Sequence, residues 1–84
     1  MEKPVVYYYD NKDPDFTPFT ITQFNGIEGD DFRVAYITIV LNHPRLGYCR
    51  NVRTSTIVKV TPDGTIETLN TIYKPTDDLE KFYE

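Results

Sequence analysis

The chain has 84 residues, a net charge of −4, and only one cysteine, one histidine and one serine. A domain of this size buries roughly 60% of the surface that its unfolded chain exposes, so it has one small core and no room for a spacious enzymatic cleft. Charge is segregated along the sequence. Residues 1–31 hold seven acidic and two basic residues, residues 32–60 hold five basic and no acidic ones, and residues 61–84 hold six acidic and two basic ones.

Cysteine usage and hydropathy indicate a compartment. Cys49 has no partner for an internal disulfide, and a domain this small in an oxidising compartment usually carries several cysteines. The most apolar run, residues 34–41, is far shorter than the roughly 20 residues that span a bilayer, and no apolar leader follows Met1. We therefore expect a soluble, cytoplasmic protein without a membrane partner.

Two strands are expected before residue 25. Residues 5–9 are β-branched and aromatic, residues 10–15 are a dense cluster of turn-forming residues, and residues 17–24 again have the composition of a strand. Asn25-Gly26 follows, and both residues accept the positive φ of a type I′ turn. The sequence thus predicts a tight hairpin in which Phe24 faces Ile27.

Residues 32–41 are expected to form the central strand. Both of their alternating faces are apolar, which is typical of a strand covered on two sides. A turn is expected over residues 42–45, because Pro44 lacks a ladder donor and disfavours helix at the residue before it. The residues expected to be mostly buried are Val34, Tyr36, Ile37, Ile39, Ile57 and Val60.

The last hairpin carries the clearest local signal. Thr61-Pro62-Asp63-Gly64-Thr65 has the composition of a type I turn, with proline at the first corner and Gly64 in the left-handed conformation. Pairing Thr61 with Thr65 predicts the register that follows. Val60 faces Ile66, Lys59 faces Glu67, Val58 faces Thr68 and Ile57 faces Leu69.

The end of the chain is expected to leave the sheet. Pro75 is predicted to stop the last strand, and residues 77–83 to form one short helical turn capped by Thr76 or Asp77. Five or six short strands with close turns predict an all-β fold, a small antiparallel meander curled into a partly closed SH3-like barrel. We expect one domain over residues 1–84, with residues 1–4 and 76–84 flexible.

Catalytic and metal chemistry is disfavoured. His43 and Cys49 supply two of the four ligands that a structural zinc site requires, and nothing marks a thiolate or an oxyanion hole. Ser55 lacks the Gly-x-Ser-x-Gly elbow of a hydrolase. The carboxylates of residues 28–31 have the chemistry to hold a hard cation, but without the EF-hand pattern a solvated turn is favoured. We expect no enzyme, no cofactor and no metal.

One constellation has recognition chemistry. Planar guanidinium groups pair with phosphate or carboxylate, and a neighbouring aromatic ring stacks on flat ligands. The alternative is that these arginines pair with acidic residues of the flanking segments. The candidate ligand- or partner-binding residues are Arg45, Tyr48, Arg50 and Arg53.

The segment from Arg53 to Tyr73 resembles the C-terminal hairpin of short accessory proteins of tailed bacteriophages and prophages. Their pattern is Arg-Thr-Ser, an apolar strand, a turn with glycine or asparagine, and Glu-Thr-x-Asn-Thr/Ser-x-Tyr. The resemblance covers about a quarter of the chain. It implies a phage-encoded protein of the bacterial cytoplasm, with Thr54 and Ser55 as strand-entry hydroxyls and Asn70 and Tyr73 closing the edge. It implies no single activity.

Two classes of function remain. The leading hypothesis is a non-catalytic phage accessory module that engages or inhibits a host protein, such as a nuclease or a defence component. Its partner is then a host or phage protein, or a further copy in a homo-oligomer. The alternative is a nucleotide or nucleic-acid binder that uses the central arginines and Tyr48. A sequence pI near 4.8 weighs against broad nucleic-acid binding.

Overall fold

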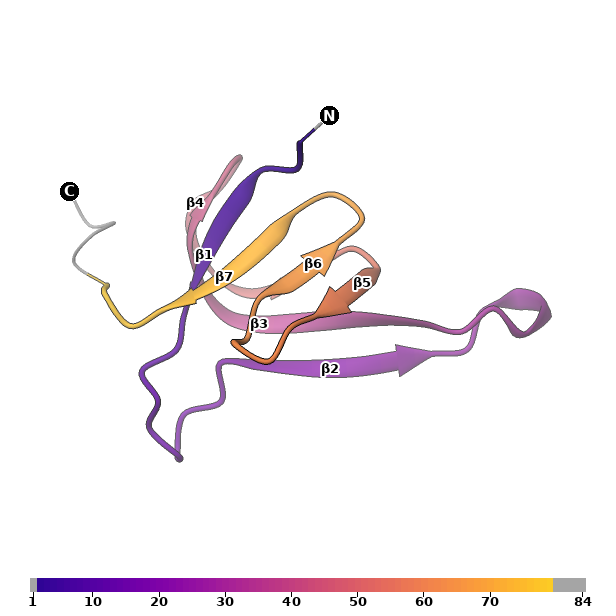
Figure 1. Ribbon diagram of the computed structural model, residues 1–84, viewed down its shortest axis with the longest axis horizontal. Helices are drawn as coiled ribbons and strands as arrows, with labels where there is room; N and C mark the ends of the chain where they lie inside the picture. Colours follow the sequence, from indigo (N-terminus) through magenta and orange to yellow (C-terminus); the bar gives the residue numbers. More distant parts are fainter. Residues whose placement is uncertain (1, 80–84) are drawn as a thin grey trace.

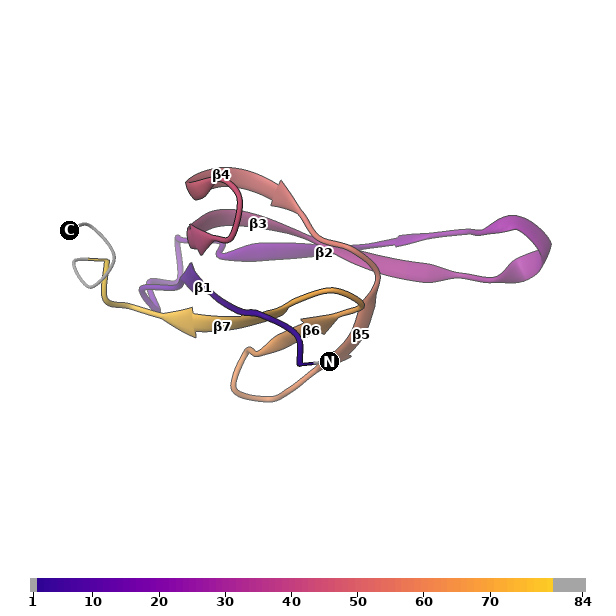
Figure 2. The ribbon, with the colours of Figure 1, turned by 90° about the horizontal axis from the view of Figure 1, so that it is seen from above.

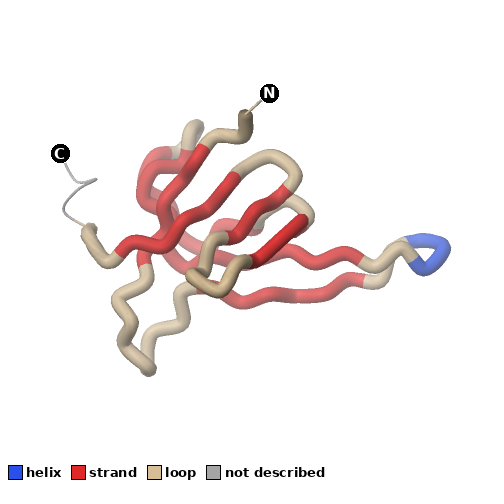
Figure 3. The backbone as a smooth tube through the Cα atoms, viewed as in Figure 1, coloured by secondary structure: helices blue, strands red, loops and turns tan. Residues whose placement is uncertain are grey.

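The computed structural model describes residues 2–79 as seven strands and one short 3-10 turn (Figures 1 and 3). The elements are β1 (Val5–Tyr9), β2 (Phe19–Phe24), η1 (Ile27–Gly29), β3 (Phe32–His43), β4 (Gly47–Arg53), β5 (Ile57–Val60), β6 (Ile66–Thr68) and β7 (Ile72–Thr76).

All seven strands belong to one sheet that curls into a half-barrel (Figures 1 and 2). The strand order is β2-β3-β1-β7-β6-β5, and β4 pairs with β3. The predicted fold class, a small all-β and partly closed SH3-like barrel, is confirmed. One pairing was not predicted, because β1 runs parallel to β7 and joins the first strand to the last. Parallel neighbours need a long crossover, and here almost the whole chain supplies it.

β3 is the central strand, as predicted, and pairs with β1, β2 and β4. Ala35 and Ile37 of β3 are completely buried. Tyr36, expected to be buried, is 38% exposed because it lies opposite Arg53 on the face that points away from the core. The core cluster consists of Val6, Tyr8, Ala35, Ile37, Val40, Ile57, Ile66 and Tyr73. Of the other residues expected there, Val34 is buried, and Ile39 and Val60 are half-buried.

The β2–β3 hairpin forms an arm that projects from the half-barrel (Figure 2). Its register runs without interruption from Phe19 opposite Ile37 to Phe24 opposite Phe32. The two phenylalanine rings at the outer end stack with centroids 5.5 Å apart. Residues 25–31 form the loop at the tip.

The predicted type I′ turn at Asn25-Gly26 is therefore wrong. Phe24 faces Phe32 and not Ile27, whose side chain is 89% exposed. Gly26 has a φ of −81°, whereas Glu28 and Gly29 adopt positive φ values. Pairing of the aromatic residues closes the hairpin further along the chain and leaves seven residues for the loop.

The β5–β6 hairpin confirms the predicted turn. The amide of Gly64 donates to the carbonyl oxygen of Thr61 at 3.0 Å, and Gly64 has a φ of +93°. Val60 faces Ile66 and Lys59 faces Glu67, as expected.

The next two predicted pairs of this hairpin are wrong. Ile57 faces Thr68, because the register shifts between Ile57 and Lys59. At this irregularity Ile57 is buried in the core and Val58 is 52% exposed. The free energy of burying Ile57 offsets the loss of regular ladder hydrogen bonds.

Two expected strand ends are also corrected. β3 continues through His43, and the turn comprises residues 44–46. β7 continues through Pro75, which lies opposite Tyr8. The amide of Ile72 and the carbonyl of Thr76 face β1, so the nitrogen of Pro75 faces the other edge, where the pairing with β6 has already ended at Tyr73.

The predicted helical turn over residues 77–83 lies partly outside the described residues. Residues 77–79 are not helical. The hydroxyl of Thr76 accepts a hydrogen bond from the amide of Asp78 at 3.2 Å, the local contact that a capping threonine makes.

Candidate functional site

The turn between β3 and β4 carries the first predicted site residue. The Nδ1 atom of His43 accepts hydrogen bonds from the backbone amides of Arg45 and Leu46, each at 3.2 Å. These bonds satisfy two backbone amides of the turn, as the side chains of Asn, Asp, Ser and Thr do in many turns. The only imidazole of the chain thus has a structural role, and it holds the exposed Arg45 at the rim of the half-barrel.

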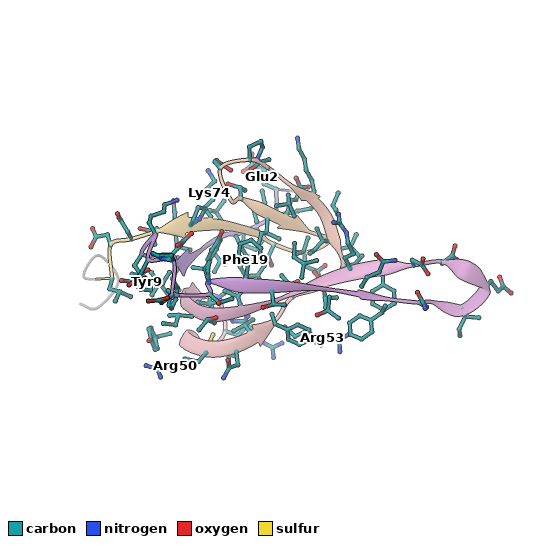
Figure 4. The ribbon with its side chains drawn as sticks, turned by 90° about the horizontal axis from the view of Figure 1, so that it is seen from below. Glu2, Tyr9, Phe19, Arg50, Arg53 and Lys74 are labelled. Atoms are coloured by element: carbon teal, nitrogen blue, oxygen red, sulfur yellow. The ribbon has the colours of Figure 1, made fainter. Side chains whose placement is uncertain are left out.

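Arg53 lies at the opposite end of β4 and contacts the arm. Its guanidinium carbon lies 5.3 Å from the centroid of the Phe24 ring, within the range of a cation–π interaction. Because Phe24 also stacks on Phe32, Arg53 connects β4 to the base of the arm tip. Figure 4 shows Arg50 and Arg53 on the same side of the molecule, away from Glu2 and Lys74.

The alternative interpretation, in which the arginines pair with carboxylates of the flanking segments, is not observed for two of them. Within residues 2–79, neither Arg45 nor Arg53 forms an ion pair. The ion pair seen in the described residues joins Lys3 to Glu67, with the Nζ atom 2.7 Å from Oε2. Arg50 and Tyr48 do have interaction partners in the protein. The positive charge at Arg45 and Arg53 is therefore not neutralised by described neighbours.

A cavity of about 320 Å³ brings Arg45 and Arg53 together. It lies between the β3–β4 turn, the segment after β4 and the β6–β7 loop, and no described carboxylate lines it. The other three cavities described each include an aspartate in their lining. The lining residues are His43, Pro44, Arg45, Arg53, Ser55, Asn70, Thr71 and Tyr73.

The other two predicted site residues lie elsewhere on β4. Tyr48 is 38% exposed and Arg50 is exposed, and neither lines the cavity. The fold thus brings together two of the four predicted residues. No local pattern marked Ser55 and Thr71 as cavity residues, because curling of the sheet brings them beside a turn distant in sequence.

The hydroxyl-rich segments beside the cavity are held by hydrogen bonds of two buried threonines, Thr54 and Thr68. The Oγ1 atom of Thr54 accepts from the amide of Ala35 at 3.0 Å and donates to the carbonyl of Ser55 at 2.8 Å. The Oγ1 atom of Thr68 bonds both the carbonyl and the amide of Thr71, at 3.0 and 3.1 Å. These bonds fix the backbone on two sides of the cavity.

The thiol of Cys49 and the imidazole of His43 are both occupied within the fold. Cys49 faces Val40 and packs half-buried against the core, and burial raises the pKa of its thiol, which disfavours the reactive thiolate. His43 lies at a different sheet position and is occupied by the turn. No group of three or more metal-ligating side chains gathers among these residues, including the carboxylates of the arm tip.

No protein-family model, curated protein or solved structure matches this chain. Within residues 2–79, the structure contains no helix of the length and hydropathy needed to cross a membrane.

Proposed function

We propose that this chain is a non-catalytic binding module that engages a protein partner through the arginine surface, defined as Arg45, Arg50 and Arg53 with Tyr48. The observation that carries the proposal is a carboxylate-free cavity between two arginines in a protein with a net charge of −4. Arginine is well suited to anchor an interface, because its planar fork pairs with carboxylates and also stacks on rings.

Electrostatics support a partner with exposed acidic groups. Arg45 and Arg53, which form no ion pair within residues 2–79, would attract such a surface during encounter and pair with it on binding. The resemblance of residues 53–73 to phage accessory proteins further supports a phage-encoded protein that binds or inhibits a host protein in the bacterial cytoplasm. A nuclease or a defence component is the class of host target that this proposal names.

The experiment is affinity capture from a bacterial lysate, followed by binding measurements with the purified partner. Arg45→Glu and the double variant Arg50→Glu/Arg53→Glu should each weaken binding at least tenfold. Lys74→Glu, on the other side of the molecule, is the charge-matched control and should bind like the wild type (Figure 4).

Stability measurements separate the two roles of the arginines. Loss of capture with an unchanged unfolding midpoint supports the arginine surface. Retained capture with a lowered midpoint assigns Arg53 a structural role at the Phe24 ring and rejects this surface as the binding site.

A nucleotide or nucleic acid is the second candidate ligand, and the residues that line the cavity favour it. Two arginines lie beside the hydroxyl of Ser55 and the amide of Asn70, groups that bond phosphate and ribose oxygens. Its volume is at the lower end of the range for small-molecule sites. Because an arginine–carboxylate interface also weakens with salt, titration with a nucleotide and with a single-stranded oligonucleotide separates the two candidates. Binding that Arg45→Glu removes would favour this second candidate, and no binding would reject it.

A further inference from the structure

β2 is an edge strand with three free backbone positions. Among residues 2–79 it pairs with β3 alone. The carbonyl of Pro18 accepts a hydrogen bond from the amide of Thr38, so residues at even positions of β2 turn their backbone groups toward β3. The amides and carbonyls of Phe19, Ile21 and Gln23 therefore point away from the sheet, in the pattern that an added strand would bond.

This edge lacks the usual protection. The sequence Phe-Thr-Ile-Thr-Gln-Phe has no charge, proline or glycine, and its register is uninterrupted. The other sheet edges differ. β4 carries arginines and a positive φ of 55° at Asn51, and β5 carries Lys59 and a register shift. Charges and irregularities of this kind prevent a strand from adding, and β2 has neither.

The position of β2 makes the edge accessible. The arm projects from the half-barrel, and no described strand lies along its outer side (Figures 1 and 2). Thr20 and Gln23 are exposed, whereas Phe19 and Ile21 pack against the core and hold the strand in place. Because β2 is already ordered, binding of a further strand would cost this protein little conformational entropy.

Charge at the two ends of β2 selects the partner. The loop before β2 contains Asp10, Asp13 and Asp15 against one base, Lys12. The tip loop, residues 25–31, contains three carboxylates and no base. Arg33, opposite Gln23, and Arg53, over the Phe24 ring, offset part of this charge and leave the tip end net acidic by one. A strand docked along β2 would have one end beside the loop before β2 and the other beside the tip loop, so both of its ends would lie near carboxylates. A strand of six residues spans roughly 20 Å, which is about two Debye lengths at physiological salt.

The same charges disfavour a second copy of the chain. Antiparallel pairing of two β2 edges about Ile21 would place the acidic tip of one copy beside the acidic base loop of the other. Like charges at that spacing repel, whereas lysine or arginine at both ends of a partner segment would be attracted.

We propose that the outer edge of β2 binds an extended segment of a protein partner by strand addition, and that this segment has an uncharged β-branched centre and basic residues at both ends. Main-chain hydrogen bonds to Phe19, Ile21 and Gln23 supply the binding, and the flanking charges supply the selectivity. The edge positions Phe19, Ile21 and Gln23 share no residue with the arginine surface, although Arg53 contacts Phe24 at the end of β2. Arg45→Glu, which is distant from that contact, is therefore the variant that distinguishes failure of one proposal from failure of the other.

A proline substitution isolates the backbone contribution. Gln23→Pro removes an amide that faces outward and leaves every amide donor that faces β3 in place, so the fold should persist. Gln23→Ala is the matched control, because it removes the same side chain and keeps the amide. Thr22→Pro, whose amide faces β3, should lower the unfolding midpoint strongly and checks the assigned orientation.

The probe is a pool of eight-residue peptides with two lysines at each end and four central positions drawn from Val, Ile, Thr and Tyr. A pool with glutamates at both ends is the control. We expect the lysine pool to bind the wild type and Gln23→Ala at least tenfold more tightly than it binds Gln23→Pro. It should also bind at least tenfold more tightly than the glutamate pool. Amide exchange at Phe19, Ile21 and Gln23 should be fast in the free protein and slow in the complex.

Three results would overturn the proposal. The first is no binding of the lysine pool, and the second is equal binding to Gln23→Pro and Gln23→Ala. The third is a concentration-dependent dimer in sedimentation that Gln23→Pro abolishes, which would assign the edge to a second copy. Unchanged binding in Arg45→Glu would show that the peptide site is independent of the arginine surface.

Discussion

The hydroxyl of Tyr8 donates a hydrogen bond to the carbonyl oxygen of Gly64, 2.5 Å away, and ties the first strand to the β5–β6 turn. The two residues lie 56 positions apart, and the Tyr8 side chain is completely buried. Its ring also packs edge-on against Phe19, so a single side chain connects the turn, the core and the base of the arm. Burial raises the pKa of the phenol, which keeps the hydroxyl protonated and able to donate.

Tyr8→Phe should destabilise the protein by about 1 kcal/mol, because it leaves the half-buried carbonyl of Gly64 without its donor while the ring still fills its space. Denaturant unfolding monitored by circular dichroism measures the change. Tyr9→Phe, in the same strand but half-buried, is the control and should change stability less. Equal stability of Tyr8→Phe and the wild type would contradict a structural role for the bond.

Gly64→Ala should destabilise by roughly 1 kcal/mol or more, because an alanine at positive φ is strained and its Cβ would lie 3.0 Å from the Tyr8 hydroxyl oxygen. Gly47→Ala is the matched control, since Gly47 also has a positive φ but no atom within 4 Å of an added Cβ. The difference between the two unfolding free energies measures the combined effect of the Tyr8 contact and of Pro75, whose Cγ would lie 3.3 Å from the added Cβ. If both variants lose the same stability, the close approach to these two residues has no energetic effect.

Thr54→Val should destabilise by about 1 to 3 kcal/mol, because the buried amide of Ala35 loses its acceptor while side-chain volume is conserved. Thr54→Ser keeps the hydroxyl and should retain more of the stability, although it removes a methyl group. Thermal unfolding of the three proteins checks the order. A valine variant as stable as the wild type would show that this hydroxyl is dispensable to the fold.

Glu67→Gln should flatten the acid limb of the stability curve. The hydrogen bond and charge of Lys3 lower the pKa of Glu67, so folding is favoured by its ionised form. This contribution is complete above the ordinary glutamate pKa of about 4.3 and is lost as pH falls through the lower folded value. The wild type should therefore exceed the variant in stability at neutral pH, and the difference should shrink in acid.

Lys3→Gln provides the test of that assignment by removing the other partner. The double variant should lose little more stability at neutral pH than either single variant, because both single changes abolish the same interaction. Additive losses would mean that Lys3 and Glu67 act separately. Asp63 retains its hydrogen bonds from the Thr61 hydroxyl and the Thr65 amide in all of these variants, so some acid destabilisation should persist.

The local features of this chain were predictable, and their limits are visible within one hairpin. The turn from Thr61 to Thr65 follows from proline and glycine at fixed positions, since these residues restrict φ whatever surrounds them. Three residues further from the turn the register shifts, because burial of Ile57 in the core outweighs a regular ladder. The predicted turn at the tip of the arm was wrong for the same reason, because Phe24 pairs with Phe32 and not with the nearby Ile27.

Two of the four residues predicted for the candidate site, Arg45 and Arg53, line the cavity, and Tyr48 and Arg50 do not. An acid-free centre with four arginines is visible in the sequence, and it predicted a site at Arg45, Tyr48, Arg50 and Arg53. Whether they met carboxylates, rings or solvent depended on how β4 lies against the rest of the sheet. The structure places Arg53 on the Phe24 ring and Arg45 at the cavity rim.

The sequence by itself determined the class of fold, the central strand and the Gly64 turn, because alternating apolar residues and restricted backbone angles act over a few neighbouring positions. Only the tertiary structure decided that β1 lies parallel to β7, that Pro75 stays within a strand and that the edge of β2 is open. Each of these depends on which strand lies alongside another. That choice rests on contacts between residues tens of positions apart, whose burial energy no local pattern encodes.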